Sequence, residues 1–256
     1  MLHPVFPHTS EWVKLMAEYL QSQILASGWY QYAYSDIFIP VIFLAGAPWA
    51  GKTEWIESFP DIEHYVILDT DLYRSLFEGY TGTNASDFHQ YASRVMDRMY
   101  SFCIKHGYNM IVDGTFSNEQ KSRENIAQCR KKWIPFSVVL VIQDPVISYL
   151  YTKKREQEKR RNVPTEAFVQ KYYQSISVVR SMYLSYPEMP FFVTRKLKWD
   201  PKFSDVQVSD IAQFDKLTQY EYNAETLSKL IEQLNHECNK NPWLLTKILW
   251  LLQKNN

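Results

Sequence analysis

Apolar residues along the chain fall into short continuous runs that alternate with stretches of helical spacing. The runs cover residues 37–45, 65–68, 110–112, 138–142 and 191–193. Because apolar and polar positions do not alternate within them, each run predicts a strand buried on both faces of a parallel sheet.

The alternation of strands and helices predicts an α/β fold of the doubly wound P-loop kinase type, with a mainly parallel sheet and helices on both faces. We expect this domain to span residues 37–197. Residues 1–36 are predicted to form an N-terminal helical segment. Residues 198–256 are predicted to form a loop and then two helices that pack on the domain.

Capping signals place several helix ends. A helical pattern over residues 88–103 stops at Gly107, and Asn223 precedes another helix. Ser117 and Gln120 have capping-box spacing, which predicts a helix start at that point. The helix over residues 10–26 has a broad apolar face, so we expect it to pack permanently on the domain. The alternative is that this helix inhibits a functional site next to the first predicted strand, which follows it in the sequence.

Composition indicates a globular protein without a global charge field. The 256 residues include 28 basic and 28 acidic side chains, so any basic site must be local. Three cysteines without paired spacing predict neither a disulfide framework nor a zinc site. No export signal or membrane span is expected, because the longest apolar run is shorter than about 18 residues. These features predict a cytoplasmic protein with no membrane partner.

A phosphate-binding motif follows the first predicted strand. The string GAPWAGKT fits G-x-x-x-x-G-K-[ST] and precedes a helical segment, which is the context that the motif requires. Backbone N–H groups of such a loop hold the phosphates of ATP, the lysine reaches the β- and γ-phosphates, and the hydroxyl binds Mg²⁺. The alternative is an ordinary glycine turn. The residues expected to bind nucleotide are Gly46, Ala47, Pro48, Trp49, Ala50, Gly51, Lys52 and Thr53.

The fourth position of the motif holds Trp49, where many small kinases have glycine. Its indole is expected to stack on a ligand or to shield the site. The alternative is a loop that no longer binds nucleotide.

Carboxylates follow the second and third predicted strands, at the sheet edge where open α/β folds bind ligands. Asp71 is a candidate base for a hydroxyl acceptor, and Asp69 is a candidate for ordering a magnesium-bound water. A helix cap is the alternative for either residue. Arg74 is a candidate for holding an anionic acceptor, with a solvated side chain as the alternative. The carboxylate of Asp113 is expected to point into the same crevice, with a capping or turn role as the alternative.

Residues 153–161 read KKREQEKRR, with six basic and two acidic side chains. Such a run on a helix is either a solvated face or part of a mobile lid that neutralises the transferring phosphoryl group.

The segments GAPWAGKT, ILDTDLYR, YNMIVDGT, SYLYTKKRE and RRNVP resemble the zeta-toxin group of P-loop kinases over about residues 41–180. Members of that group are bacterial toxins that phosphorylate UDP-N-acetylglucosamine at the 3′-hydroxyl of the sugar. The resemblance implies that ATP and Mg²⁺ are used and that an antitoxin protein is a partner. It implies the following catalytic residues: Lys52, Asp71, Arg155 and Arg161.

The resemblance also implies an acceptor pocket at the end of the third strand, where Asp113 replaces the glutamate of the group and where Thr115 follows. This difference leaves the exact acceptor open. The same segments are similar to polynucleotide 5′-kinases, which makes a nucleic-acid 5′-hydroxyl the alternative acceptor. A non-catalytic nucleotide-binding module and another metabolite kinase are further alternatives.

Overall fold

Six strands form one sheet in the computed structural model, which describes residues 6–7, 9–27, 40–60, 62–159, 163–196 and 203–254. Their order is β2-β3-β1-β4-β5-β6. Strands β1 to β5 run parallel, and β6 pairs antiparallel with β5. This arrangement confirms the predicted mainly parallel sheet, although the start of the first predicted run, residues 37–39, lies outside the described residues. In chain order the strands are Val41–Ala45, Val66–Asp69, Met110–Asp113, Phe136–Ile142, Phe191–Lys196 and Phe203–Gln207.

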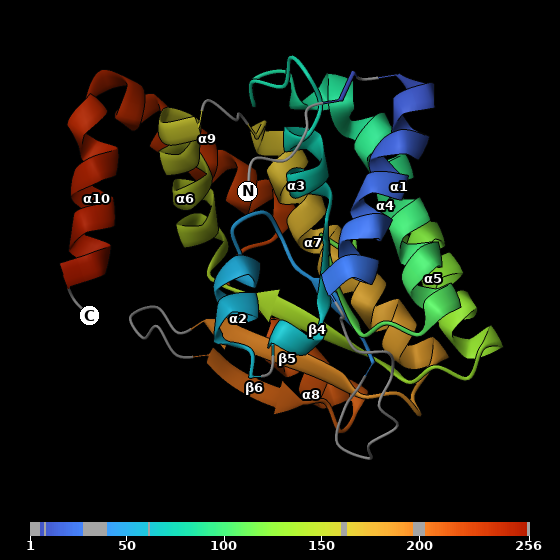
Figure 1. Ribbon diagram of the computed structural model, residues 1–256. Helices are drawn as coiled ribbons and strands as arrows, with labels where there is room; N and C mark the ends of the chain where they lie inside the picture. The colour runs from blue at the N-terminus through green and yellow to red at the C-terminus, as the bar shows by residue number, and fades with distance from the viewer. Residues whose placement is uncertain are drawn as a thin grey trace.

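Helices cover both faces of the sheet, as the continuous apolar runs predicted (Figure 1). In β1, Phe43 packs into the larger core on one face and Leu44 into the smaller core on the other. The helices of the larger core are α1 (Ser10–Ser27), α3 (Thr70–Ser75), α4 (Ala85–His106), α5 (Glu119–Lys131), α7 (Thr165–Ser185) and α8 (Ile211–Thr218). The smaller core is covered by α2 (Lys52–Ser58) and the 3₁₀ helix η1 (Ile62–His64).

Helix ends follow the local capping signals with one correction. α4 stops at Gly107, which has a left-handed φ of 73° and donates its N–H to the Cys103 carbonyl. Asn223 caps α9 (Ala224–Lys240) with a complete capping box. The predicted start of α5 at Ser117 is wrong by one residue. The side chain that accepts the first-turn N–H is that of Asn118, whose short amide suits the cap position equally well.

The segment after residue 197 contains more structure than the predicted loop and two helices. It adds β6 to the sheet and α8 to the larger core before α9 and α10 (Pro242–Lys254) begin. The pattern of β6 is hard to detect because an edge strand needs few apolar side chains. Its Asp205 accepts hydrogen bonds from Trp55 Nε1 and Thr194 Oγ1, so a polar residue fixes this strand.

The N-terminal helix α1 lies alongside α4 (Figure 1). Its inner face is buried in the larger core through Val13, Met16 and Ala17. Just before it, Phe6 forms a short parallel bridge with Phe77, and the Phe6 N–H donates to the Leu76 carbonyl at 2.8 Å. These contacts attach α1 to the α4 side of the domain as a packed layer.

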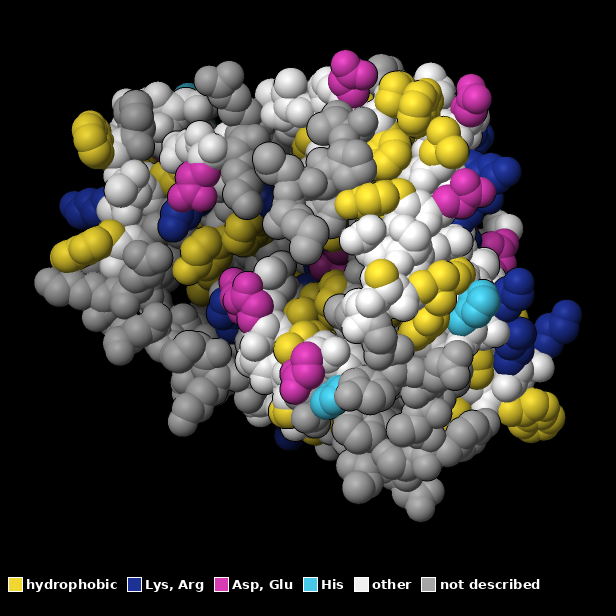
Figure 2. Space-filling model, in the orientation of Figure 1, with side chains coloured by type: hydrophobic (Ala, Val, Ile, Leu, Met, Phe, Trp, Pro, Cys, Tyr) yellow, Lys and Arg dark blue, Asp and Glu magenta, His cyan; other side chains and the backbone are white. Residues whose placement is uncertain are grey.

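The opposite end of the molecule is formed by α10, which packs on α9 and on α6 (Pro145–Lys159) through Leu245 and Leu150. Figure 2 shows hydrophobic side chains on the surface at this edge. Trp243 and Trp250 are exposed there. None of the helices in the described ranges is long and apolar enough to cross a membrane.

Candidate active site

The carboxyl ends of β1, β2 and β3 bring the predicted site residues to one edge of the sheet. Strand order places β3 between the other two, and Asp69 lies opposite Asp113 in the parallel register. The motif loop begins directly after β1, and the short helix α3 (Thr70–Ser75) follows β2. Figure 2 shows a recess in this face of the molecule in which acidic and basic side chains lie.

The motif loop has the backbone of a phosphate-binding loop. Gly46 has a φ of 140° and Gly51 a φ of 101°, conformations that glycine adopts at little cost. Lys52 is the first residue of α2 and folds over the loop, where its Nζ donates to the Gly46 carbonyl at 3.2 Å and to the Ala47 carbonyl at 3.0 Å. Gly51 provides no side-chain cap for α2, and Thr53 is exposed in its first turn. The start of α2 therefore offers backbone donors to an anion.

Thr115 supports this loop through its backbone. Its carbonyl accepts the N–H of Gly46 at 3.3 Å and the hydroxyl of Ser175, from α7, at 2.6 Å. The Thr115 hydroxyl lies 2.8 Å from the Ser117 hydroxyl. Sequence reasoning placed Thr115 in the acceptor pocket and missed Ser175, which nothing near it in the sequence connects to the motif.

The surroundings of Asp113 favour the neutral form of its carboxyl group. Burial raises its pKa to about 6, because the nearby charge of Lys52 offsets only part of the desolvation and Asp69 adds repulsion. Its Oδ1 is buried and makes no hydrogen bond within the described part of the chain. This oxygen is thus available for a ligand donor beside the motif lysine.

The two candidate carboxylates after β2 differ in what they contact. Asp69 caps α3, since its Oδ1 accepts the N–H of Asp71 at 2.7 Å. Asp71 instead forms ion pairs with Arg74 in α3 and with Arg155 in α6, the latter at 3.9 Å between Oδ2 and Nη2. The cap alternative therefore applies to Asp69. The side chain of Asp71 lies between two guanidinium groups.

Arg74 is buried, so the alternative of a solvated side chain is wrong. Its Nη2 pairs with Asp71, and its Nη1 lies 3.2 Å from Nδ1 of His89 in α4. Sequence reasoning missed His89 because the contact joins two helices, and the fifteen-residue separation follows no local period. Arg74 thereby orients Asp71 from the side of α4.

The basic run on α6 divides between two surroundings. Lys153 pairs with Glu156 at 2.8 Å on the face of the helix that lines the cavity described below, and Lys154 pairs with Glu158 at 3.8 Å. Arg155 faces the site, where its Cζ lies 5.0 Å from the centre of the Trp49 ring. Arg161, the second predicted lid arginine, lies outside the described residues.

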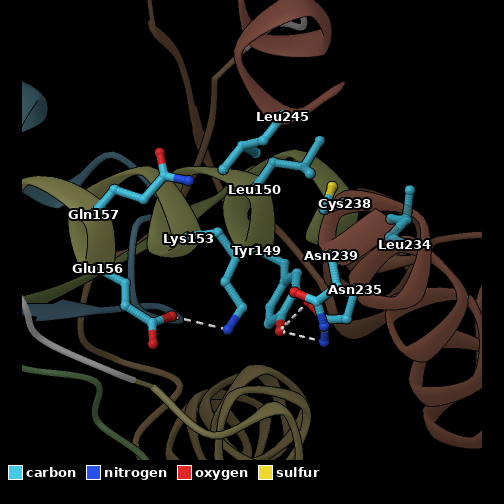
Figure 3. A pocket seen from close by; sticks show the side chains of 10 residues that line it. All are labelled: Tyr149, Leu150, Lys153, Glu156, Gln157, Leu234, Asn235, Cys238, Asn239 and Leu245. Carbon is cyan, nitrogen blue, oxygen red and sulfur yellow. Dashed lines mark hydrogen bonds and ion pairs between the residues drawn. The ribbon is translucent and has the colours of Figure 1, made fainter. Parts of the chain in front are cut away.

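A separate cavity of about 630 Å³ lies between α6, α9 and α10 (Figure 3). Four of its polar residues pair with one another: Lys153 with Glu156, and the Tyr149 hydroxyl with the Asn235 side chain at 2.8 Å. None of the candidate site residues lines it. The cavity therefore marks the face of α6 opposite the motif loop.

Comparison with known proteins gives a family and a fold. The family described as Zeta toxin matches residues 40–190, more than half of the chain. No curated protein matches the sequence. The structure of the PezAT chromosomal toxin–antitoxin system of Streptococcus pneumoniae is similar with a TM-score of 0.65 and 17% identity, over 90% of this chain and 95% of that chain.

The complex of AvrRxo1-ORF1 with AvrRxo1-ORF2 is also similar. Its structure with sulphate ions has a TM-score of 0.58 and 15% identity, over 81% of this chain and 72% of that chain, and the structure with ATP gives the same values. At these identities the structural matches establish a shared fold.

Proposed function

The chain belongs to the zeta-toxin family of P-loop kinases, and from this we propose that it transfers the γ-phosphoryl group of ATP to a hydroxyl of a nucleotide sugar such as UDP-N-acetylglucosamine. One observation carries the proposal. Asp71 in α3 forms an ion pair with Arg155 in α6, and Lys52 at the start of α2 lies close enough to Asp113, at the carboxyl end of β3, to lower its pKa. Phosphoryl transfer needs this combination of a base and positive charges around the transferring group.

In the proposed reaction the motif loop binds the phosphates of ATP. Backbone N–H groups at the start of α2, from Gly51 to Thr53, face the phosphate oxygens, and Lys52 neutralises the charge that develops on the β- and γ-phosphates. Arg155, and Arg161 from the adjoining segment, add positive charge from the lid.

The residues present also fit a magnesium ion, which prefers oxygen ligands and keeps several waters. Thr53 offers an exposed hydroxyl beside the loop, and Asp69 is a carboxylate one residue before α3. We assign Thr53 to direct coordination and Asp69 to a contact through water. When bound, the ion would neutralise phosphate charge.

Asp71 acts as the general base in this proposal. Its carboxylate accepts the proton of the acceptor hydroxyl while that oxygen forms a bond to the γ-phosphorus. The bond from the γ-phosphorus to the bridging oxygen breaks, and ADP leaves with that oxygen. Arg74 holds Asp71 in place for this step.

The acceptor pocket is assigned to the space next to Asp71. Arg74 supplies positive charge there, and Asp113 and Thr115 supply oxygen atoms for the hydroxyl or amide groups of a sugar. The buried Oδ1 of Asp113 supports this assignment. A hydrogen bond from a ligand donor would remove the energetic cost of a buried oxygen that has no hydrogen-bond partner.

We also propose an antitoxin protein as a partner. The family membership supports this proposal, and a matched structure is described as a toxin–antitoxin system. Co-purification of the chain with the product of a small neighbouring reading frame tests it.

A transfer assay tests the function itself. The protein is incubated with γ-labelled ATP, Mg²⁺ and a panel of nucleotide sugars and 5′-hydroxyl oligonucleotides. We expect label on a nucleotide sugar. Lys52→Ala should reduce the rate at least about a hundredfold, as expected for the loss of one preorganised charge. Lys229→Ala, which changes an exposed lysine on α9, is the matched control and should leave the rate unchanged.

The other outcomes separate the alternatives. Label on the oligonucleotide would make the chain a polynucleotide 5′-kinase. Nucleotide binding without transfer to any acceptor would make it a binding module.

A further inference from the structure

Trp49 occupies a backbone conformation that favours glycine. Its φ is 64°, and it is one of three non-glycine residues with positive φ in the described ranges. A bulky side chain in the left-handed region is strained, so the surrounding contacts must hold it there. The conformation alone would be better served by glycine, which indicates that the indole contributes something that glycine lacks.

The indole supports one face of α6. The Tyr151 ring stacks on it at 6.3 Å between centres with an angle of 16° between planes, and the Arg155 guanidinium lies over it at 5.0 Å. Tyr151 and Arg155 are four residues apart, so they project from the same side of the helix. An aromatic face attracts a guanidinium group electrostatically, and this attraction gives Arg155 a preferred position.

Arg155 has a second contact, with Asp71. Its Nη2 lies 3.9 Å from Oδ2 of Asp71, and the Arg155 side chain is three-quarters buried. Arg74, itself buried, holds the other carboxylate oxygen of Asp71. The guanidinium group of Arg155 therefore contacts both the Trp49 ring and the Asp71 carboxylate.

The rest of α6 is anchored independently of Trp49. Leu150 packs on Leu245 of α10, and the Tyr149 hydroxyl bonds to Asn235 of α9, on the face shown in Figure 3. Removal of the indole should thus leave the helix in place and change mainly the side chain of Arg155.

We propose that Trp49 is a positioning residue that holds the Arg155 guanidinium beside Asp71. The consequence for phosphoryl transfer rests on the proposed function. Trp49 acts through Arg155 and takes no part in the chemical step. A tryptophan that stacked on the nucleotide would instead change nucleotide affinity.

Steady-state kinetics distinguish these roles. Trp49→Gly, which also relieves the backbone strain, should lower kcat about tenfold and change KM for ATP less than about twofold. Trp49→Tyr, which keeps an aromatic face, should recover most of this loss. In an Arg155→Ala background, Trp49→Gly should have no further effect.

Trp133→Gly is the matched control. Trp133 also has a positive φ, 57°, and its side chain is 88% exposed. The substitution makes the same chemical and backbone change away from the site, so kcat should not change.

A measurement without turnover keeps the positioning role testable by itself. In protein labelled with ¹⁵N-arginine, the Nε–H signal of Arg155, assigned with Arg155→Lys, should be displaced by the ring current of Trp49. The displacement should disappear in Trp49→Gly and remain in Trp133→Gly. If it disappears as expected but the wild-type protein transfers no phosphoryl group, the positioning role stands and the proposed function is wrong.

Two results would overturn the positioning role. One is an Arg155 signal that does not respond to Trp49→Gly. The other is a kinetic effect of Trp49→Gly that appears in KM for ATP and adds to that of Arg155→Ala, which would assign the indole to the nucleotide.

Discussion

Replacement of Gly46 with alanine should destabilise the protein at the point where the motif loop leaves β1. The φ of Gly46 is +140°, which is unfavourable for any residue with a Cβ. A Cβ built there lies 2.3 Å from the Val141 carbonyl oxygen and 3.3 Å from the Ala50 Cβ. The nearest atom belongs to the backbone of β4, a strand inside the sheet, so it cannot move aside cheaply.

The magnitude follows from two separate costs. Overpacking of a filled interior costs about 1–3 kcal/mol. A disfavoured backbone conformation costs a further 1–3 kcal/mol, approximately. We expect the free energy of unfolding of Gly46→Ala to fall by roughly 2–6 kcal/mol, which is a large part of the stability of a typical domain.

Two other glycines separate these costs. Gly79 has a φ of +78° and no atom within 4 Å of a built Cβ, so Gly79→Ala should show only the conformational cost, about 1 kcal/mol. Gly114 has no positive φ, and its nearest atom, the Phe116 nitrogen, lies 3.9 Å away. Gly114→Ala should be neutral or stabilising by a few tenths of a kcal/mol, approximately, because alanine restricts the unfolded chain.

Urea-induced unfolding followed by circular dichroism measures all three variants, provided that the m-value stays constant. Nucleotide affinity should fall in Gly46→Ala, because the loop has to shift. If Gly46→Ala lowers the free energy of unfolding no more than Gly79→Ala does, then Gly46 does not lie as close to the backbone of β4 as the structure shows.

Three further predictions concern the carboxylates and the first helix. Asp71→Asn should keep ATP binding and lower transfer at least about a hundredfold, with a smaller effect for Asp69→Asn; the reverse order in a transfer assay would make Asp69 the base. Burial raises the pKa of Asp113 from 3.8 to about 6, so the folded protein binds this proton more tightly than the unfolded chain does. Stability of the wild type relative to Asp113→Asn should therefore fall by up to about 3 kcal/mol as the pH rises from about 4 to 7, and equal pH slopes in magnesium-free urea titrations would contradict the assignment. Deletion of residues 1–27 should lower both stability and turnover, because the inner face of α1 is buried in the larger core; higher turnover after truncation would instead indicate an inhibitory segment.

Features that depend on neighbouring residues could be predicted from the sequence. The continuous apolar runs predicted β1 to β5, because a strand covered on both faces has no polar position to accommodate. The motif GAPWAGKT predicted the loop between β1 and α2, since the glycines and the lysine act within a few residues of one another. Gly107 and Asn223 predicted helix ends for the same reason.

Residues that meet across the fold could not be assigned in this way. The sequence suggested Asp71 as the base and Asp69 as the residue near magnesium, but it left a helix cap as the alternative for both. Only the packed structure separates a helix cap from a carboxylate between two arginines. It also could not connect Trp49 with Arg155, because α6 begins nearly a hundred residues after the loop. Sequence periodicity reports which side of an element is buried, whereas the partner across the interface depends on how separate elements pack. The sequence thus determined the fold class and the motif loop, and the tertiary structure decided which side chains face one another at the site.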